Sequence, residues 1–133
     1  MTRYLLDTSA LMALLEDEAG ATQVRDLLLN EECWLSALSL VEVAYITRQE
    51  NGEDEAHLRY ALLTQSGAQI LWHLDEAIVL TAARLKANQR VSFADAMIAA
   101  SAIQQKATLV HKDPEFEALA NEITLQALPY KKS

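Results

Sequence analysis

The sequence has few of the residues that break up or staple small folds. Its 133 residues include three glycines, two prolines and a single cysteine, Cys33. One cysteine cannot form an intramolecular disulfide, so a disulfide scaffold is excluded and a reducing cytoplasm fits the composition. The shortage of glycine and proline excludes a flexible linker, and turns must use Asn, Asp and Ser. We therefore expect one domain over residues 1–133.

Long apolar runs and an excess of positive charge are also absent. No stretch approaches the about 20 apolar residues that cross a bilayer, so no membrane association is expected. Asp7 interrupts the N-terminal segment, which lacks a small-residue cleavage site and does not read as a secretory signal. The 19 acidic and 11 basic residues give a net charge of −8. Because this charge repels polyanions, binding of nucleic acid would need a local basic strip, a metal ion or a partner.

Strand-like and helix-like segments alternate along the chain, which predicts an α/β fold with a parallel sheet covered on both faces. The expected strands are 3–6, 33–36, 68–72, 108–110 and 123–125. The expected helices are 9–16, 21–29, 40–49, 55–65, 75–87 and 93–105, with a short helix after Pro114. Trp34 and Trp72 lie in strand-like runs and are expected in the core. In such a sheet, ligands bind beyond the carboxyl ends of the strands.

Four acidic residues fall at predicted strand ends or helix starts. Asp7 follows the first strand directly, and Asp113 follows the fourth by two residues. Glu42 and Asp95 are expected in the first turns of two helices. Asp95 lies in the apolar stretch SFADAMIAAS, where no Lys or Arg stands within four residues of it. All four acids could therefore meet at one edge of the sheet.

A structural explanation competes with this shared site. Ser39 with Glu42, and Ser92 with Asp95, each match the capping box, in which two side chains satisfy the free amides of a helix start. Such a cap is compatible with function, because a first-turn acid is held in place by its helix and stabilised by the macrodipole.

Asp7 and Asp113 could likewise cap helices, the second with Pro114 at the first helical position. If the acids converge instead, two unit charges about 4 Å apart repel by roughly 4 kcal/mol at an effective dielectric near 20. Convergence then requires a cation, and a site made only of oxygen donors selects Mg²⁺ or Mn²⁺. No HxxxH or CxxC pattern competes for zinc.

Four sequence blocks in this order resemble the PIN-domain ribonucleases, and most closely the VapC-type toxins of prokaryotic toxin–antitoxin pairs. The blocks are YLLDTSALMALL, LSLVEVAYI, SFADAMIAASAI and ATLVHKDPEFE, which span residues 4–117. The resemblance implies a three-layer αβα sandwich around a central parallel sheet. It also implies metal-dependent endonucleolytic cleavage of RNA, a cognate antitoxin and a homodimer.

By position, the resemblance assigns the family's catalytic, metal-binding acids to Asp7, Glu42, Asp95 and Asp113, with Ser9 as the supporting hydroxyl. We expect Asp7 and Asp95 to bind Mg²⁺ or Mn²⁺. Glu42 and Asp113 would complete the shell, bind a second ion or position the attacking water.

The last block departs from the family pattern, because His111 stands where the family usually has Thr. The spacing after Asp113 also differs, so that Glu115 competes with it for the role of fourth acid. Phosphates of the substrate are expected to meet Arg90 and Lys112, which lie beside the acids in sequence.

More distant basic residues, Arg48, Arg84 and Lys86, could extend this strip, or all of these cations could be ordinary surface charges. His57, His73 and His111 are expected on the surface or in packing. Two other functions remain open. A receiver-like domain also gathers acids at strand ends, but the acid spacing does not match it. A non-catalytic RNA-binding or scaffolding PIN protein is the second, and His111 is its main support.

Overall fold

Five parallel strands form a single sheet in a computed structural model that describes residues 2–131. The strands are β1 (Arg3–Leu6), β2 (Glu32–Ser36), β3 (Gln69–Leu71), β4 (Thr108–His111) and β5 (Leu125–Ala127). The helices are α1 (Thr8–Leu15), α2 (Ala21–Asn30), α3 (Ala37–Asn51), α4 (Glu53–Thr64), α5 (Glu76–Asn88), α6 (Phe93–Gln105) and the short 3₁₀ helix η1 (Pro114–Leu119). None of the helices in residues 2–131 is both long and apolar enough to span a bilayer.

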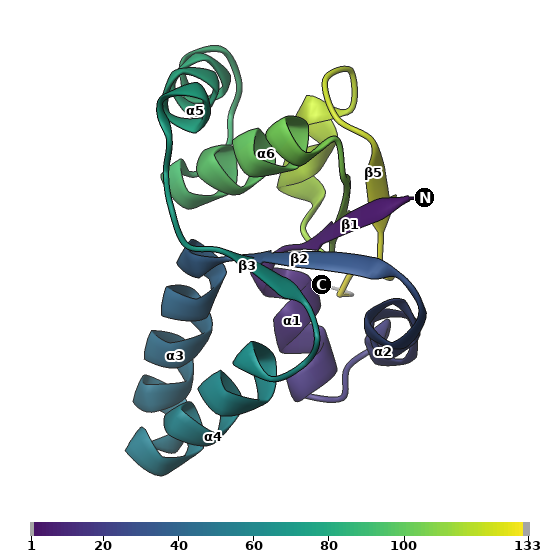
Figure 1. Cartoon of the computed structure of the whole chain (residues 1–133), viewed down its shortest axis with the longest axis vertical. Coiled ribbons are helices and arrows are strands. Elements are labelled where there is room, and N and C mark those ends of the chain that lie inside the picture. Colours follow the sequence, from purple (N-terminus) through teal and green to yellow (C-terminus); the bar gives the residue numbers. More distant parts are fainter. Residues whose placement is uncertain (1, 132–133) are drawn as a thin grey trace.

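Helices cover both faces of the sheet, as the alternating pattern predicts. Figure 1 shows α1 to α4 on one side of the strands and α5 and α6 on the other. Successive residues of a strand point to opposite faces. In β1, Leu5 packs with the α5–α6 layer and Leu6 with the α1–α4 layer, and both are fully buried. Burial on both faces is the reason that β1 reads as a continuous apolar run.

The strand order β3-β2-β1-β4-β5 places β1 in the middle, next to β4. From β1 the chain adds β2 and β3 on one side and then β4 and β5 on the other. The direction of winding therefore reverses between β1 and β4. At such a point a crevice opens beyond the carboxyl ends of the strands. The amide of Asp7 donates to the Val110 carbonyl over 3.0 Å and closes the two strands just before they diverge.

One helix begins earlier than the sequence suggested. We expected a helix over 40–49 with a Ser39–Glu42 capping box; the helix is present, but its expected start and cap were wrong. Helix α3 begins at Ala37, and the Ser36 hydroxyl caps it by accepting from the amide of Leu38 over 3.1 Å. The strand runs directly into the helix, so the first available hydroxyl takes the cap. Ser39 is buried inside the helix and Glu42 lies in its second turn.

Two smaller expectations also need correction. The final strand is Leu125–Ala127 rather than 123–125, because Ile123 is a buried core residue that precedes the pairing with β4. Trp72 is not in the core: it follows the edge strand β3, and 54% of its surface is exposed. Trp34, on the inner strand β2, is partly buried against the α5–α6 layer.

Candidate active site

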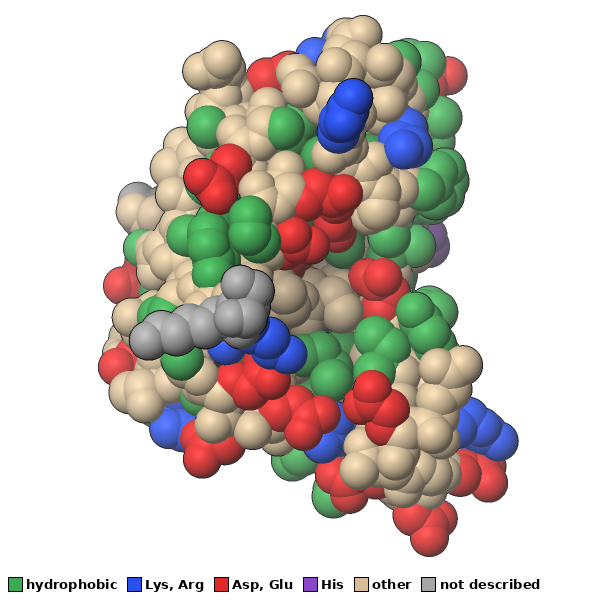
Figure 2. All heavy atoms as spheres, turned by 180° about the vertical axis from the view of Figure 1, so that it is seen from behind, with side chains coloured by type: hydrophobic (Ala, Val, Ile, Leu, Met, Phe, Trp, Pro, Cys, Tyr) green, Lys and Arg blue, Asp and Glu red, His purple; other side chains and the backbone are tan. Residues whose placement is uncertain are grey.

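The four predicted acids line one cavity of about 570 Å³. Asp7 comes from the end of β1, Glu42 from α3, Asp95 from the first turn of α6, and Asp113 from the residues after β4. Figure 2 shows acidic side chains gathered around a hollow in the middle of this face. The carboxylates thus meet beyond the carboxyl ends of β1 and β4, at the reversal of the winding.

Asp7 is held by its own helix and by the neighbouring strand. It caps α1, and its Oδ1 accepts from the amide of Ala10 over 2.8 Å. The Ser9 hydroxyl lies 2.8 Å from both carboxylate oxygens of Asp7 and donates to them. The same hydroxyl accepts from the amide of Lys112 over 2.8 Å. Ser9 therefore supports Asp7 and links it to the chain after β4.

The environment of Asp7 favours its protonated form. The pKa of Asp7 is raised from 3.8 to about 7, chiefly because its side chain is almost completely buried. Hydrogen bonds from Ala10 and Ser9 oppose the shift, while the nearby charges of Asp113 and Glu42 add to it. A carboxyl group in such a place is kept ionised at neutral pH by a nearby cation.

Glu42 is positioned by a residue that sequence analysis missed. The Thr8 hydroxyl donates to Glu42 Oε1 over 2.6 Å, and it lies 3.0 Å from the Ser39 hydroxyl. Thr8 stands between Asp7 and Ser9 in the DTS triplet, so the triplet itself was the available signal. Because Thr8 opens α1 and Glu42 belongs to α3, this bond fixes the two helices at the cavity wall.

Asp95 lies at a helix start that is capped in only one direction. The Ser92 hydroxyl accepts from the amide of Asp95 over 3.1 Å, as the capping box predicts. The reciprocal position is taken by another acid, because the Ser92 amide donates to Glu115 Oε2 over 3.2 Å. The carboxyl group of Asp95 is thereby left facing the cavity, where it also lines the wall.

Asp113 and Glu115 complete a cluster with Asp95. Asp113 caps η1, and its Oδ1 accepts from the amide of Glu115 over 2.9 Å. One carboxylate oxygen from each of Asp95, Asp113 and Glu115 lies within 4.8 Å of the others, a spacing that suits a shared metal ion. Asp113 lines the cavity and Glu115 lies beside it in this cluster, so the role of either acid as the fourth ligand stays a prediction.

Asp95 and Glu115 shift each other's pKa in opposite directions. The pKa of Asp95 is raised from 3.8 to about 8, first by burial and then by a hydrogen bond with the Glu115 carboxyl and by the charges of Asp7, Glu115 and Asp113. The same hydrogen bond lowers the pKa of Glu115. Asp95 is the more buried of the two groups, so ionisation is less favourable for Asp95 than for Glu115.

The predicted basic residues do not all reach the cavity. Lys112 does, but its side chain is only 5% exposed, and its Nζ contacts the Ala19 carbonyl at 2.9 Å and Glu18 at 3.5 Å. Arg90 is exposed and lies outside the cavity wall. Contact of either residue with substrate phosphate stays a prediction.

The more distant cations have partners of their own. Arg48 and Arg84 pair with Glu53 and Glu122 at 3.6 and 2.6 Å. Lys86 donates to the Val91 carbonyl over 2.8 Å.

His111 does not line the cavity. It is buried, its ring lies 5.2 Å from that of Phe116 and 6.0 Å from that of Tyr130, and burial lowers its pKa. Its Nδ1 accepts from the amide of Asp113 over 3.3 Å. His111 thus packs behind the site and holds the backbone of Asp113.

Comparison with known proteins agrees with this arrangement. The family model described as "PIN domain" matches residues 4–122. No curated protein matches the sequence.

Several solved structures share the fold at low sequence identity. VapBC2 from Rickettsia felis, bound to a DNA fragment from its promoter, superposes with a TM-score of 0.79 at 18% identity, covering 96% of this chain and 100% of that one. VapBC-1 from nontypeable Haemophilus influenzae gives 0.74 at 22% identity, covering 95% and 98%. VapC20 from Mycobacterium tuberculosis, a toxin that cleaves the sarcin-ricin loop, gives 0.71 at 18% identity, covering 86% and 93%.

Proposed function

Because the chain belongs to the PIN domain family, we propose that it is a VapC-type toxin: an endoribonuclease that uses Mg²⁺ or Mn²⁺ and is held inactive by a cognate antitoxin. The observation that carries the proposal is the meeting of Asp7, Glu42, Asp95 and Asp113 in one cavity. Within residues 2–131, no salt bridge reaches any of these four acids.

The donor set suits a hard dication. The site offers carboxylate oxygens, with a hydroxyl from Ser9 and no thiol or exposed imidazole, which is the chemistry that Mg²⁺ and Mn²⁺ prefer. The raised pKa values of Asp7 and Asp95 support the same view, because both groups resist ionisation until a positive charge is supplied. When bound, the ion would lower the pKa of the attacking water and neutralise charge on the phosphate.

Each carboxylate has a role that follows from its place. Asp7 is buried and Asp95 has a raised pKa, and these two would hold the ion, with Asp113 and Glu115 on the side of η1. Glu42 stands on the opposite wall, where Thr8 fixes one of its oxygens. Glu42 is therefore placed to orient the water and accept its proton. Asp113 would complete the shell or hold a second ion.

RNA is the substrate class that we propose. The family resemblance supports it, and the similarly folded VapC20 is described as cleaving the sarcin-ricin loop. A strand whose scissile phosphate enters the cavity would place that group among the acids, where repulsion is relieved only by the ion. Turnover should therefore require metal at every substrate concentration.

The partner that we propose is an antitoxin encoded by the neighbouring reading frame, and the active form is a homodimer. Similarly folded structures are toxin–antitoxin complexes. Expression of the chain alone should arrest growth, and co-expression of the neighbouring frame should relieve the arrest and yield a co-purifying complex. A chain that is harmless when expressed alone would contradict the toxin role.

A single substitution tests the chemistry. Asp95→Asn removes the charge and keeps the size, so RNA cleavage in Mn²⁺ should fall at least about 100-fold, since even changes behind a metal ligand cost up to about 100-fold. Asp26→Asn makes the same change on the exposed face of α2 and should leave the rate unchanged. Cleavage by Asp95→Asn that persists in EDTA would refute the mechanism. Metal binding by the unaltered protein with no turnover on any RNA would point to a non-catalytic PIN protein.

A further inference from the structure

The acids that line the two ends of the cavity differ in their salt-bridge partners. At one end lie the four acids, which no salt bridge within residues 2–131 reaches. At the other end, Glu16 pairs with Arg59 at 3.1 Å. Glu18 pairs with Lys112 at 3.5 Å and with Lys131 at 3.1 Å. A dication suits the first end, whereas at the second the exposed cation among these lining residues is Lys131.

The two lysines at this second end are not equivalent. The Lys112 side chain is 5% exposed and also donates to the Ala19 carbonyl, so it stabilises the turn after α1. The Lys131 side chain is 71% exposed, and Glu18 is its salt-bridge partner. An exposed Lys–Glu pair is weak, typically no more than about 1 kcal/mol. Lys131 can therefore exchange Glu18 for a stronger anion at little cost.

The segment 128–131 holds Lys131 at the rim by its own packing. The amide of Leu128 donates to the His111 carbonyl over 2.7 Å, and the Leu128 side chain is buried. It packs against Gly20, where the φ of +99° and a neighbour 3.0 Å from the position of a Cβ leave no room for a side chain. Tyr130 lies against the ring of His111. The unusual His111 thus supports the segment that carries Lys131.

We propose that Lys131 binds a backbone phosphate of the RNA strand next to the one that is cleaved, and that Glu18 is its counter-ion in the free protein. This inference rests on the proposed function, because it names a substrate contact of the same cavity. Figure 2 shows basic side chains at the edge of the same hollow that gathers the acids. Exchange of a carboxylate for an RNA phosphate also releases condensed cations from the strand, which favours binding at low salt.

The direct test compares the binding of a short, fluorescently labelled, mixed-sequence single-stranded RNA in Ca²⁺ across a series of salt concentrations. Lys131→Gln should weaken binding about two- to fivefold, the range expected for one exposed charge contact. It should also reduce the slope of log Kd against log salt by about 0.7, the value for one phosphate on a single strand. In steady-state cleavage, KM should rise and kcat should stay the same, because the contact acts on binding.

Lys106→Gln is the matched control. Lys106 ends α6 just before β4 begins, at the opposite edge of the sheet, and it is exposed. The Lys106→Gln substitution removes the same charge as Lys131→Gln, so any general effect of net charge appears in both variants. Equal behaviour of Lys131→Gln and Lys106→Gln would overturn the proposal.

Glu18→Gln gives the opposite prediction, which a loss of folding cannot imitate. Removal of the counter-ion should tighten RNA binding about two- to fivefold and steepen the salt dependence. Unchanged or weaker binding would contradict the exchange. This test and the test of the proposed function can fail separately. If Lys131→Gln weakens RNA binding but the protein shows no metal-dependent cleavage, only the nuclease function is rejected. Normal cleavage without that effect would reject only the phosphate contact.

Discussion

The amide of Lys112 donates to the hydroxyl of Ser9 over 2.8 Å, and through it the chain after β4 is fixed to the carboxylate of Asp7. The two residues stand 103 positions apart in sequence. This bond joins the segments after β1 and β4 at the point where the two strands diverge and the cavity opens. The placement of the acids thus depends on a neutral hydroxyl as well as on the acids themselves.

Removal of this hydroxyl should reduce both stability and activity. Ser9→Ala leaves the Lys112 amide without its acceptor, and an unpaired part-buried donor costs about 1–3 kcal/mol of unfolding free energy. Cleavage should also fall, because Asp7 loses a hydrogen bond that fixes its oxygens. Urea denaturation and initial rates measure the two effects. Ser66→Ala, in a turn before β3, should cost less than Ser9→Ala; an equal loss would contradict the role of Ser9.

Stability in EDTA should decrease as pH rises. The pKa values of Asp7 and Asp95 lie at about 7 and about 8 in the folded protein, above the ordinary value of 3.8. The folded state therefore binds more protons than the unfolded state between about pH 4 and pH 8, and the free energy of unfolding falls through that range. The melting temperature should drop by at least several degrees between pH 5 and pH 8.

Mn²⁺ should reverse this trend, because the ion binds the ionised carboxylates and only in the folded state. The added stability should be larger at pH 8 than at pH 5. Asp95→Asn in EDTA should show a shallower dependence on pH than the unaltered protein. A melting temperature that rises with pH in EDTA would contradict the raised pKa values.

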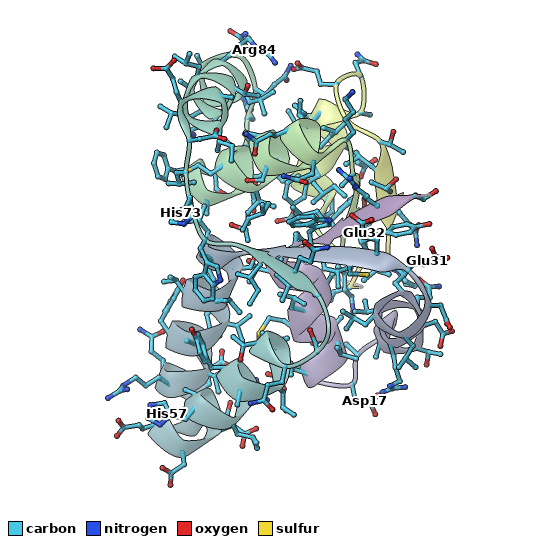
Figure 3. All side chains as sticks on the ribbon, in the orientation of Figure 1. Asp17, Glu31, Glu32, His57, His73 and Arg84 are labelled. Atoms are coloured by element: carbon cyan, nitrogen blue, oxygen red, sulfur yellow. The ribbon has the colours of Figure 1, made fainter. Side chains whose placement is uncertain are left out.

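Glu115 should contribute to metal binding although the four-acid pattern leaves it out. Glu115→Gln removes one of the three carboxylates that lie within 4.8 Å of one another, so Mn²⁺ affinity measured by calorimetry should fall about tenfold or more. Glu31→Gln is the control, because Figure 3 shows Glu31 at the turn between α2 and β2, at the other edge of the sheet. Identical Mn²⁺ affinities in the two variants would place Glu115 outside the metal site.

The buried guanidinium of Arg59 should be sensitive to a conservative change. It joins α4 to Glu16 and Thr47 at 3.1 and 3.2 Å, it also contacts Glu55 of the same helix at 3.3 Å, and its side chain is 9% exposed. Arg59→Lys keeps the charge but cannot maintain this fork. The free energy of unfolding should fall by about 1–2 kcal/mol, since the carboxylates are partly exposed and solvent screens them. Arg25→Lys, on the exposed face of α2, should change it little.

The sequence predicted the layers and the edge that carries the site, because local patterns determine both. Short apolar runs indicate strands, and longer segments with helical spacing of apolar residues indicate helices. The carboxyl ends of parallel strands then lie at one edge of the sheet. Asp7, Asp95 and Asp113 were located because each cap is a local signal. The start of α3 was missed because two serines compete to cap it, and only the packing of Ser39 decides between them.

The remaining parts of the site depend on contacts between distant segments. Thr8 meets Glu42, Ser92 meets Glu115 and Glu18 meets Lys131, and in each pair the partners come from different elements. Neither the periodicity nor the spacing of residues in the sequence predicts such a contact. Glu115 had a weak local signal, its place two residues after Asp113, whereas Lys131 had none.

The central claim is that Asp7 and Asp95 share a dication, and a crystal soaked in Mn²⁺ tests it most directly. Anomalous difference density should appear in the cavity within coordination distance of both carboxylates, with Asp113 or Glu115 beside it. If Mn²⁺ occupies other acidic positions of the same crystal while the space between Asp7 and Asp95 stays without anomalous density, the two carboxylates do not share a dication.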